Sequence, residues 1–351
     1  MNRRGVSYDV GRVLGVQWRP VYDPKVVHRE LEIIKNDLHC NAVRICGLSI
    51  ARLIPAAEAA LQQGLEVWLS PEMWDQSQEK TLAYIAKAAA AAEPLRRQWK
   101  ERLVFSVGSE ATLFMQGIVE GRNITKRMSN PSFWQNAKAG THNAPLNAFL
   151  AKATKAVRGV FHGQITYAAL IWEAVDWSLF DFVGVDHYRA ARIKDRYTDM
   201  LKPLLTLGKP VIVTEFGFRA YRGAEDAVGL PDIVDNKSLF LHQLPLVGRF
   251  VRPRMKVLLV RDEELQAREL TDQLHVLDGA GVDGAFIMTF VAPIAPHSDD
   301  PRYDIDMSSY GLVKSYERGH GTTYPDMPWE PKAAFKAAAE FYGSAATVRV
   351  S

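Results

Sequence analysis

The chain has 351 residues, of which 47% are apolar, 24% charged and 10% aromatic. These proportions are those of a folded globular protein and exclude a disordered or collagen-like chain. The net charge is +3, with Lys and Arg spread along the sequence, so charge does not predict a nucleic-acid partner. Without a signal-peptide pattern or about 18 uninterrupted apolar residues, the sequence predicts a cytoplasmic protein with no membrane span.

Short apolar runs alternate with segments of helical periodicity, a pattern that predicts a parallel sheet wrapped by helices. The candidate strands are 12–17, 41–46, 65–70, 102–108, 164–170, 181–186, 210–215 and 283–290. Eight strands are the number that a closed (β/α)8 TIM barrel needs, and the length suits one such domain over residues 1–351.

Several helices carry start and stop signals. Asp23 followed by Pro24 opens the first helix, and Ser49 and Gly64 bracket the second. A third, Ala-rich helix is predicted over 76–100 and is expected to break at Pro94. The later helices are predicted over 143–158, 191–207, 261–279 and 331–342.

Three connections are too long to be simple turns: 109–142 after strand four, 217–260 after strand seven and 291–329 after strand eight. All three leave the carboxyl ends of strands, where barrel enzymes build their sites. The segment 217–260 is unusually apolar and basic for a loop. We interpret it as a lid or a homodimer contact in preference to a membrane-surface patch.

No cofactor or metal is expected. The sequence lacks the glycine-rich phosphate-binding patterns and the GxSxG nucleophile elbow. Cys40 and Cys46 do not have the spacing of a zinc site and are predicted to be buried, reduced thiols. The acidic loop 299–306 does not match the calcium-binding EF-hand pattern and is expected to be solvated.

Two glutamates follow predicted strands. Glu110 ends strand four and Glu215 ends strand seven, so both can point into one barrel mouth from facing walls. Two carboxyl groups about 5 to 5.5 Å apart can hydrolyse a glycoside with retention, whereas a wider pair implies inversion. Each glutamate alone could instead be a structural acid paired with an arginine.

The string TEFG at 214–217 and the N-x-V-R pattern at 41–44 give a more specific signal. With these motifs in this strand order, the whole chain resembles the retaining (β/α)8 glycoside hydrolases of clan A. The resemblance implies that Glu110 is the acid/base and Glu215 the nucleophile. It places Arg44 beneath the nucleophile and Tyr188 in a hydrogen bond with it, and more weakly implicates His187.

The other strand ends carry aromatic, amide and charged groups that suit a pyranose, whose apolar faces stack while its hydroxyls find partners. The substrate-binding candidates are Gln17, Trp18, Glu72, Trp74, Trp172, Glu173, Arg219 and Phe290. The tryptophans could equally be rim packing.

The chain departs from the clan pattern at two positions. Ser109 stands where clan members have Asn before the acid/base, and Phe290 stands where strand eight commonly ends in a Trp that floors the sugar subsite. These changes indicate an unusual sugar or a glycosylated small molecule as the substrate.

Three functions remain open: glycoside hydrolysis, a non-hydrolytic acid/base reaction of secondary metabolism using the same glutamates, and carbohydrate binding without turnover. The chain also resembles an actinobacterial group labelled "abortive infection protein", a label that no residue here connects with a mechanism.

Overall fold

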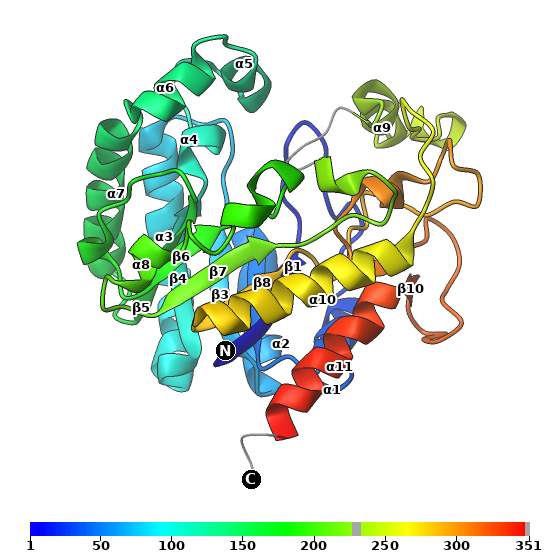
Figure 1. Cartoon of the computed structure of the whole chain (residues 1–351), viewed down its shortest axis with the longest axis horizontal. Helices are drawn as coiled ribbons and strands as arrows, with labels where there is room; N and C mark the ends of the chain where they lie inside the picture. The colour runs from blue at the N-terminus through cyan, green and yellow to red at the C-terminus, as the bar shows by residue number, and fades with distance from the viewer. Residues whose placement is uncertain (227–232, 348–351) are drawn as a thin grey trace.

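The computed structural model describes residues 1–226 and 233–347 (Figure 1). Eight parallel strands follow one another around a closed barrel, in which β1 pairs with both β2 and β8. They are β1 (Arg3–Asp9), β2 (Ala42–Gly47), β3 (Glu66–Pro71), β4 (Leu103–Ser109), β5 (Gln164–Leu170), β6 (Val183–Asp186), β7 (Val211–Phe216) and β8 (Gly284–Ile287). This confirms the predicted (β/α)8 barrel.

Helices surround the barrel and decorate its upper end. The surrounding helices are α1 (Pro24–Asn36), α2 (Ile50–Gln62), α3 (Gln78–Trp99), α7 (Asn143–Arg158), α8 (Lys202–Leu205), α10 (Glu263–Ala280) and α11 (Ala333–Thr347). Short helices in the loops are α4 (Ala111–Phe114), α5 (Ile124–Met128), α6 (Phe133–Ala139) and α9 (Asn236–His242). Strands β9 (Val313–Ser315) and β10 (Trp329–Pro331) form a separate antiparallel pair. Single 3-10 turns occupy Lys100–Arg102, Trp177–Leu179, Ala191–Arg196, Ala224–Asp226, Gly248–Phe250 and Ile305–Ser308.

Large apolar side chains fill the lower half of the barrel interior. One buried cluster collects the inward residues Ala42, Trp68, Val104, Phe182, Ile212 and Phe286. Above this layer the inward positions become polar, as with Arg44 one step further along β2 and Ser70 along β3. The interior therefore changes from a sealed apolar floor to a polar site at the carboxyl ends of the strands.

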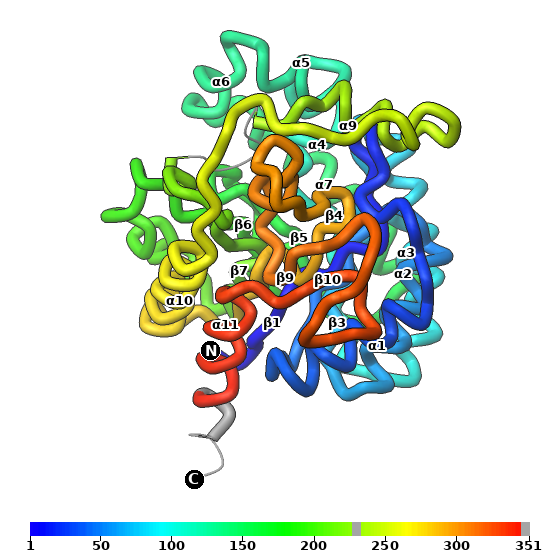
Figure 2. Tube along the Cα trace, turned by 90° about the vertical axis from the view of Figure 1, so that its right-hand side faces the viewer, coloured from blue at the N-terminus to red at the C-terminus, as the bar shows by residue number. Residues whose placement is uncertain are grey.

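The long loops gather at that end. Figure 1 shows α4 to α6 on one side of the barrel's upper end and α9 on the other, and Figure 2 shows the same end opposite the two chain termini. In the described residues no helix combines the length and apolar character that a bilayer span requires.

The first predicted strand is wrong. Strand β1 is Arg3–Asp9, and 12–17 lies in the loop that follows it. Gly11 and Gly15 have φ of 123° and 74°, which turn the backbone out of an extended course. Arginine at positions 3 and 4 concealed the strand, although Arg3 is neutralised by Glu66 and Asp283 at the barrel's lower end.

Three other predicted elements also differ. Helix α3 continues through Pro94, because buried residues on both sides of the proline, among them Ala92 and Leu95, hold it against the core. The region 191–207 contains only a 3-10 turn and α8 in place of one helix, and β8 ends at Ile287 rather than at 290. The two thiols are buried and free, as predicted.

Candidate active site

Glu110 occupies a backbone position that few side chains adopt. Its φ and ψ are 45° and 44°, in the left-handed region, at the point where β4 turns into α4. Its amide donates to the carbonyl of Ala168 on β5 (2.8 Å), and the next amide, that of Ala111, donates to the Tyr167 hydroxyl (2.7 Å). Strand β5 therefore holds the turn that presents Glu110 at the barrel end.

Glu215 is presented by the TEFG string of β7. Position 217, two residues after Glu215, must be glycine, because a Cβ on Gly217 would lie 2.6 Å from the carbonyl oxygen of Met288. A hydrogen bond from the His187 amide to the Glu215 carbonyl (2.8 Å) ties the end of β7 to β6. The carboxylate of Glu215 is thereby fixed on the wall of the mouth.

Two cations and one phenol surround the Glu215 carboxylate. The Arg44 guanidinium donates to Oε1, and the Tyr188 hydroxyl donates to Oε2 (2.8 Å). Arg12 lies 3.9 Å from Oε1 and donates to Glu72 (3.0 Å), which also accepts from Arg44 (3.1 Å). Glu72 thus anchors both arginines beside Glu215.

These surroundings move the pKa values of the two glutamates in opposite directions. Burial alone would raise the pKa of Glu215, but the charges of Arg44 and Arg12 outweigh burial and lower it. Burial raises the pKa of Glu110 well above its usual value, and the neighbouring carboxylates of Asp186 and Glu215 raise it further. The surroundings therefore favour the ionised form of Glu215 and the protonated form of Glu110.

Asp186 is a third carboxyl group in the mouth. It accepts hydrogen bonds from Thr214 Oγ1 (2.6 Å) and from Ser109 Oγ (3.2 Å). Burial, followed by the charge of Glu215, raises the pKa of Asp186 well above its usual value. Ser109, the residue before Glu110, is therefore engaged with a carboxyl group on β6.

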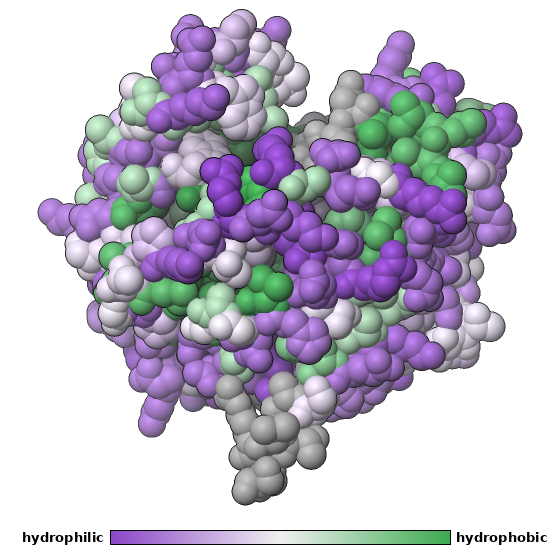
Figure 3. All heavy atoms as spheres, viewed as in Figure 1, coloured by the Kyte–Doolittle hydropathy of each residue, from purple (hydrophilic) through white to green (hydrophobic). Residues whose placement is uncertain are grey.

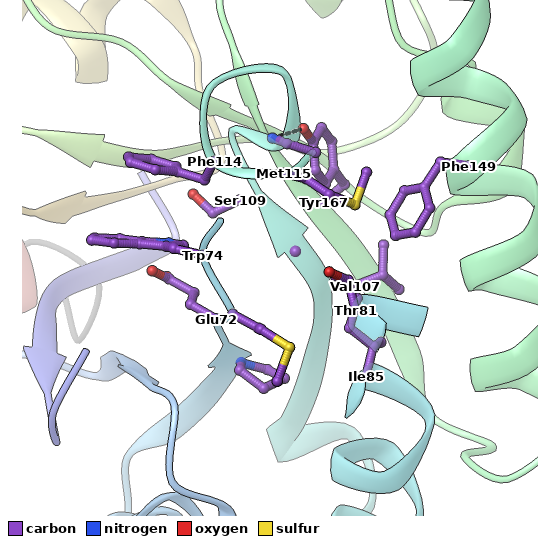
Figure 4. Close-up of a pocket in the computed structure, with 14 residues that line it drawn as sticks. Glu72, Trp74, Thr81, Ile85, Val107, Ser109, Phe114, Met115, Phe149 and Tyr167 are labelled. Carbon is purple, nitrogen blue, oxygen red and sulfur yellow. Dashed lines mark hydrogen bonds between the residues drawn. The ribbon is translucent and has the colours of Figure 1, made fainter. Parts of the chain in front are cut away.

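Two of the predicted tryptophans line the rim together. Trp18 and Trp74 contact edge to face with ring centroids 5.4 Å apart, and the guanidinium of Arg12 lies over both rings. Trp74 also stacks on Phe114 of α4 with centroids 4.3 Å apart (Figure 4). The aromatic rim is thus joined directly to the arginine beside Glu215.

A small cavity of about 20 Å³ lies beside the mouth, with room for about one water. Figure 4 shows Glu72, Trp74 and Ser109 on one side of it and apolar side chains such as Val107 and Phe149 on the other. Neither Glu110 nor Glu215 lines this cavity, so it is a recess behind the rim and not the mouth itself.

Some predicted site residues point elsewhere. The His187 ring stacks on Tyr197 and contacts its carbonyl, and burial lowers the pKa of His187 to about 4. Glu173 accepts from the Tyr167 hydroxyl and from the amides of Thr112 and Leu170, and burial raises its pKa to about 7. These side chains support the loops after β5 and β6 from behind.

Trp172 and Gln17 also serve loop packing. Trp172 packs edge to face on Phe133 and His142 beside α6 and α7. The backbone of Gln17 exchanges two hydrogen bonds with the side chain of Gln243 in the loop after β7. These contacts join neighbouring loops of the rim.

The prediction that Phe290 floors the sugar subsite is wrong. Phe290 is fully buried against Trp329 and Phe335, between the barrel and α11. The aromatic ring of this loop that reaches the site is instead Tyr310, whose centroid is 5.1 Å from that of Tyr188, the donor to Glu215. The guanidinium of Arg219 lies over the Tyr310 ring, 4.0 Å from its centroid.

Three contributors were not predicted from the sequence: Arg12, Asp186 and Tyr310. Arg12 falls within the predicted strand 12–17, whereas the structure places it in the loop at the end of β1, paired with Asp9. Asp186 directly precedes the His-Tyr pair and was visible as a strand-end acid. Tyr310 lies in a long loop, where no sequence pattern indicates a place in the site.

Among the described residues no group of His, Cys, Asp and Glu side chains is arranged to hold a metal ion.

No family model matches the chain, and no curated protein sequence matches it significantly. Solved structures share its fold. A GH113 β-1,4-mannanase superposes with a TM-score of 0.60 at 14% identity, over 98% of this chain and 99% of its own. A family 5 glycoside hydrolase from Prevotella bryantii B14 gives 0.53 at 13% identity, over 97% and 96%. The β-glucuronidase of Parabacteroides merdae gives 0.57 at 12% identity, over 97% of this chain and 37% of that one. The chain therefore has the barrel fold of these enzymes.

Proposed function

We propose that the protein is a glycoside hydrolase that works by double displacement, with Glu215 as nucleophile and Glu110 as acid/base. The observation that carries this proposal is the placement of Glu110 and Glu215 at the carboxyl ends of β4 and β7, where Arg44 and Tyr188 hold the Glu215 carboxylate and the two pKa values move in opposite directions. A nucleophile must be ionised and an acid must be protonated at the same pH, and separate environments achieve both. The shared fold with glycoside hydrolases supports the same assignment.

In the first step a Glu215 oxygen attacks the anomeric carbon while Glu110 gives its proton to the departing glycosidic oxygen. Cleavage leaves a covalent glycosyl-enzyme and an ionised Glu110. In the second step Glu110 takes a proton from water, the hydroxide displaces Glu215, and the sugar leaves with retained configuration. Arg44 and Tyr188 hold the Glu215 carboxylate in position through both steps.

We further propose an unusual sugar or a glycosylated small molecule as substrate. The residue before the acid/base is a serine whose hydroxyl is bonded to Asp186, so a carboxyl group takes part where an amide would otherwise stand. A raised pKa favours the neutral form of Asp186, which exchanges hydrogen bonds with hydroxyl groups and does not attract a cation. This arrangement favours a sugar that departs from the ordinary 2-hydroxyl over a simple glucoside.

Asp186 also supports a second candidate function, a non-hydrolytic acid/base reaction of secondary metabolism. Three carboxyl groups in one mouth, two of them with raised pKa, exceed what hydrolysis requires. Turnover in ¹⁸O-labelled water separates the two candidates. Hydrolysis places the label on the anomeric hydroxyl of the released sugar, whereas an isomerisation or elimination does not.

The test is a panel of activated aryl glycosides of both anomeric configurations, including 2-deoxy and 2-amino sugars. The proteins compared are wild type, Glu215→Gln, Glu110→Gln and the matched control Glu66→Gln. Glu66 lies at the opposite end of the barrel, where it accepts from Arg3 (2.6 Å) and Trp68 (2.8 Å). Its loss therefore reports general damage without touching the mouth.

We expect Glu215→Gln to abolish turnover with every leaving group. Glu110→Gln should lower kcat by roughly 10²- to 10⁴-fold on a poor leaving group and far less on an activated one, which needs little protonation. Glu66→Gln should leave kcat/KM unchanged, and proton NMR should show a retained anomer. Full turnover in Glu215→Gln would refute the nucleophile assignment.

A further inference from the structure

The loop after β7 contains a segment of unusual charge. Residues 236–261, here called the rim segment, include six Lys and Arg residues and no Asp or Glu. Arg261 is neutralised internally by Asp304 and Asp306. The other five cations, Lys237, Arg249, Arg252, Arg254 and Lys256, are all exposed.

The rim segment is anchored beside the barrel mouth. Gln243 joins it to the loop after β1, through hydrogen bonds of 2.8 and 2.7 Å with the Gln17 backbone. The Met255 amide donates to the carbonyl of Arg302 (2.8 Å) in the loop after β8. Figures 1 and 2 show α9, its first helix, at the upper end of the barrel. The segment is therefore a built part of the rim.

This segment also presents large apolar side chains to solvent. Phe250 is 81% exposed, and Leu246 and Leu258 are each 72% exposed. Phe240, Val247, Val257 and Val260 are exposed as well. Figure 3 shows the apolar colour gathered over the α9 side of the upper end, next to hydrophilic atoms. Apolar groups concentrated in this way mark an interaction surface.

Its cations stand among the apolar groups. The guanidinium of Arg249 lies 5.3 Å from the centroid of the Phe250 ring. In the part of the chain that the structure describes, Asp235 pairs with Arg254, and Glu317 lies 3.7 Å from His242. The partner of this surface must therefore accept apolar side chains and supply negative charge.

We propose, in place of the lid or homodimer contact expected from the sequence, that the rim segment binds the surface of an anionic lipid bilayer, with Leu246, Phe250 and Leu258 in the head-group boundary and the exposed cations against the lipid phosphates. A bilayer offers apolar depth and negative charge in one layer. A second copy of the chain fits less well, because a two-fold interface would bring the same cations face to face. This inference is independent of the catalytic proposal.

The experiment is co-sedimentation of the full chain with vesicles of phosphatidylcholine alone and with phosphatidylglycerol added. The apolar variant is Leu246→Ser with Phe250→Ser, and the charge variant is Arg249→Gln with Arg252→Gln. Leu207→Ser and Arg97→Gln are matched controls, since these exposed residues precede β7 and β4 and so lie at the opposite end of the barrel. Circular dichroism checks the folding of each variant.

We expect binding only when phosphatidylglycerol is present. The charge variant should bind about 25-fold more weakly, at about five-fold per charge. The apolar variant should bind at least about ten-fold more weakly, and the controls should match wild type. Turnover of a soluble substrate should not change in any of these variants.

Three results would overturn the proposal. They are equal binding to neutral and anionic vesicles, unchanged binding by the folded apolar variant, and no binding at low salt. Analytical ultracentrifugation adds a fourth: a dimer that the apolar variant dissociates, without vesicle binding, would assign the surface to a second copy.

Discussion

The carboxylate of Glu215 depends on two hydrogen-bond donors and one further cation, which come from three different elements. Arg44 comes from β2, Arg12 from the loop after β1, and Tyr188 from just beyond β6. Each favours the ionised form of Glu215, so the loss of any one should raise its pKa. A hydrogen bond to a charged group contributes about 1.5–3 kcal/mol, which corresponds to one to two pH units.

Tyr188→Phe tests this dependence at a single atom. A glutamate with a lowered pKa stays ionised down to lower pH, so activity is lost only as pH falls through that pKa. Removing the hydroxyl should move the acidic limb of the kcat/KM profile upward by about one unit. Tyr197→Phe is the matched control, because that hydroxyl donates to the carbonyl of His187 and not to a glutamate. An unmoved acidic limb in Tyr188→Phe would contradict the role assigned to the phenol.

The sequence predicted the partners that lie on or directly after regular strands, and Arg44 and Tyr188 are such residues. Arg12 and Tyr310 belong to irregular loops, where periodicity carries no information about direction. Asp186 was visible, but its importance arises from Ser109 and Thr214 converging on it from two other strands. Such convergence depends on the register between neighbouring strands, and a local sequence pattern carries no information about that register.

At the scale of elements, the segment after β8 does two separate tasks. Phe290 turns outward and fills the space between the barrel and α11, while Tyr310, further along the same loop, packs against Tyr188 of the site. Early termination of β8 at Ile287 explains why counting strand residues put Phe290 in the wrong place. A side chain three residues past a strand end no longer follows its alternation.

These two aromatic residues should therefore give opposite phenotypes. Phe290→Ala should destabilise the protein by about 3–5 kcal/mol, because it leaves a cavity in a closed core, without changing KM. Tyr310→Ala should change KM or kcat with a much smaller loss of stability. Urea unfolding and steady-state kinetics measure both quantities, and a Phe290→Ala variant with altered KM and full stability would restore the subsite assignment.

At the scale of the whole molecule, closure of the barrel depends on the seam between β1 and β8. Gly5 lies opposite Phe286 across this seam, and a Cβ there would stand 2.3 Å from the Phe286 ring. No such contact occurs between real atoms, so the ring or the strand must move. The strand count predicts the (β/α)8 architecture. It does not predict that position 5 must lack a side chain, because that requirement arises from the pairing of β1 with the distant β8.

Gly5→Ala should destabilise the protein by about 1–3 kcal/mol, the usual cost of overpacking. Gly279→Ala is its matched control. Gly279 lies within α10, and a Cβ there meets nothing within 4 Å, so this change should raise stability by roughly 0.5–1 kcal/mol. Thermal denaturation of the two variants should shift in opposite directions, and equal shifts would show that the seam accommodates the added carbon.

The same seam orders events during synthesis. Its paired segments lie about 280 residues apart, and the first strand leaves the ribosome long before the eighth exists. Until β8 emerges, the nascent sheet has two unpaired edges: β1 and the strand made most recently, which is finally β7. Unpaired edges of this kind invite pairing with other chains. The growing polypeptide therefore passes most of its translation as an open sheet, and its risk of aggregation ends only when the last strand joins the first.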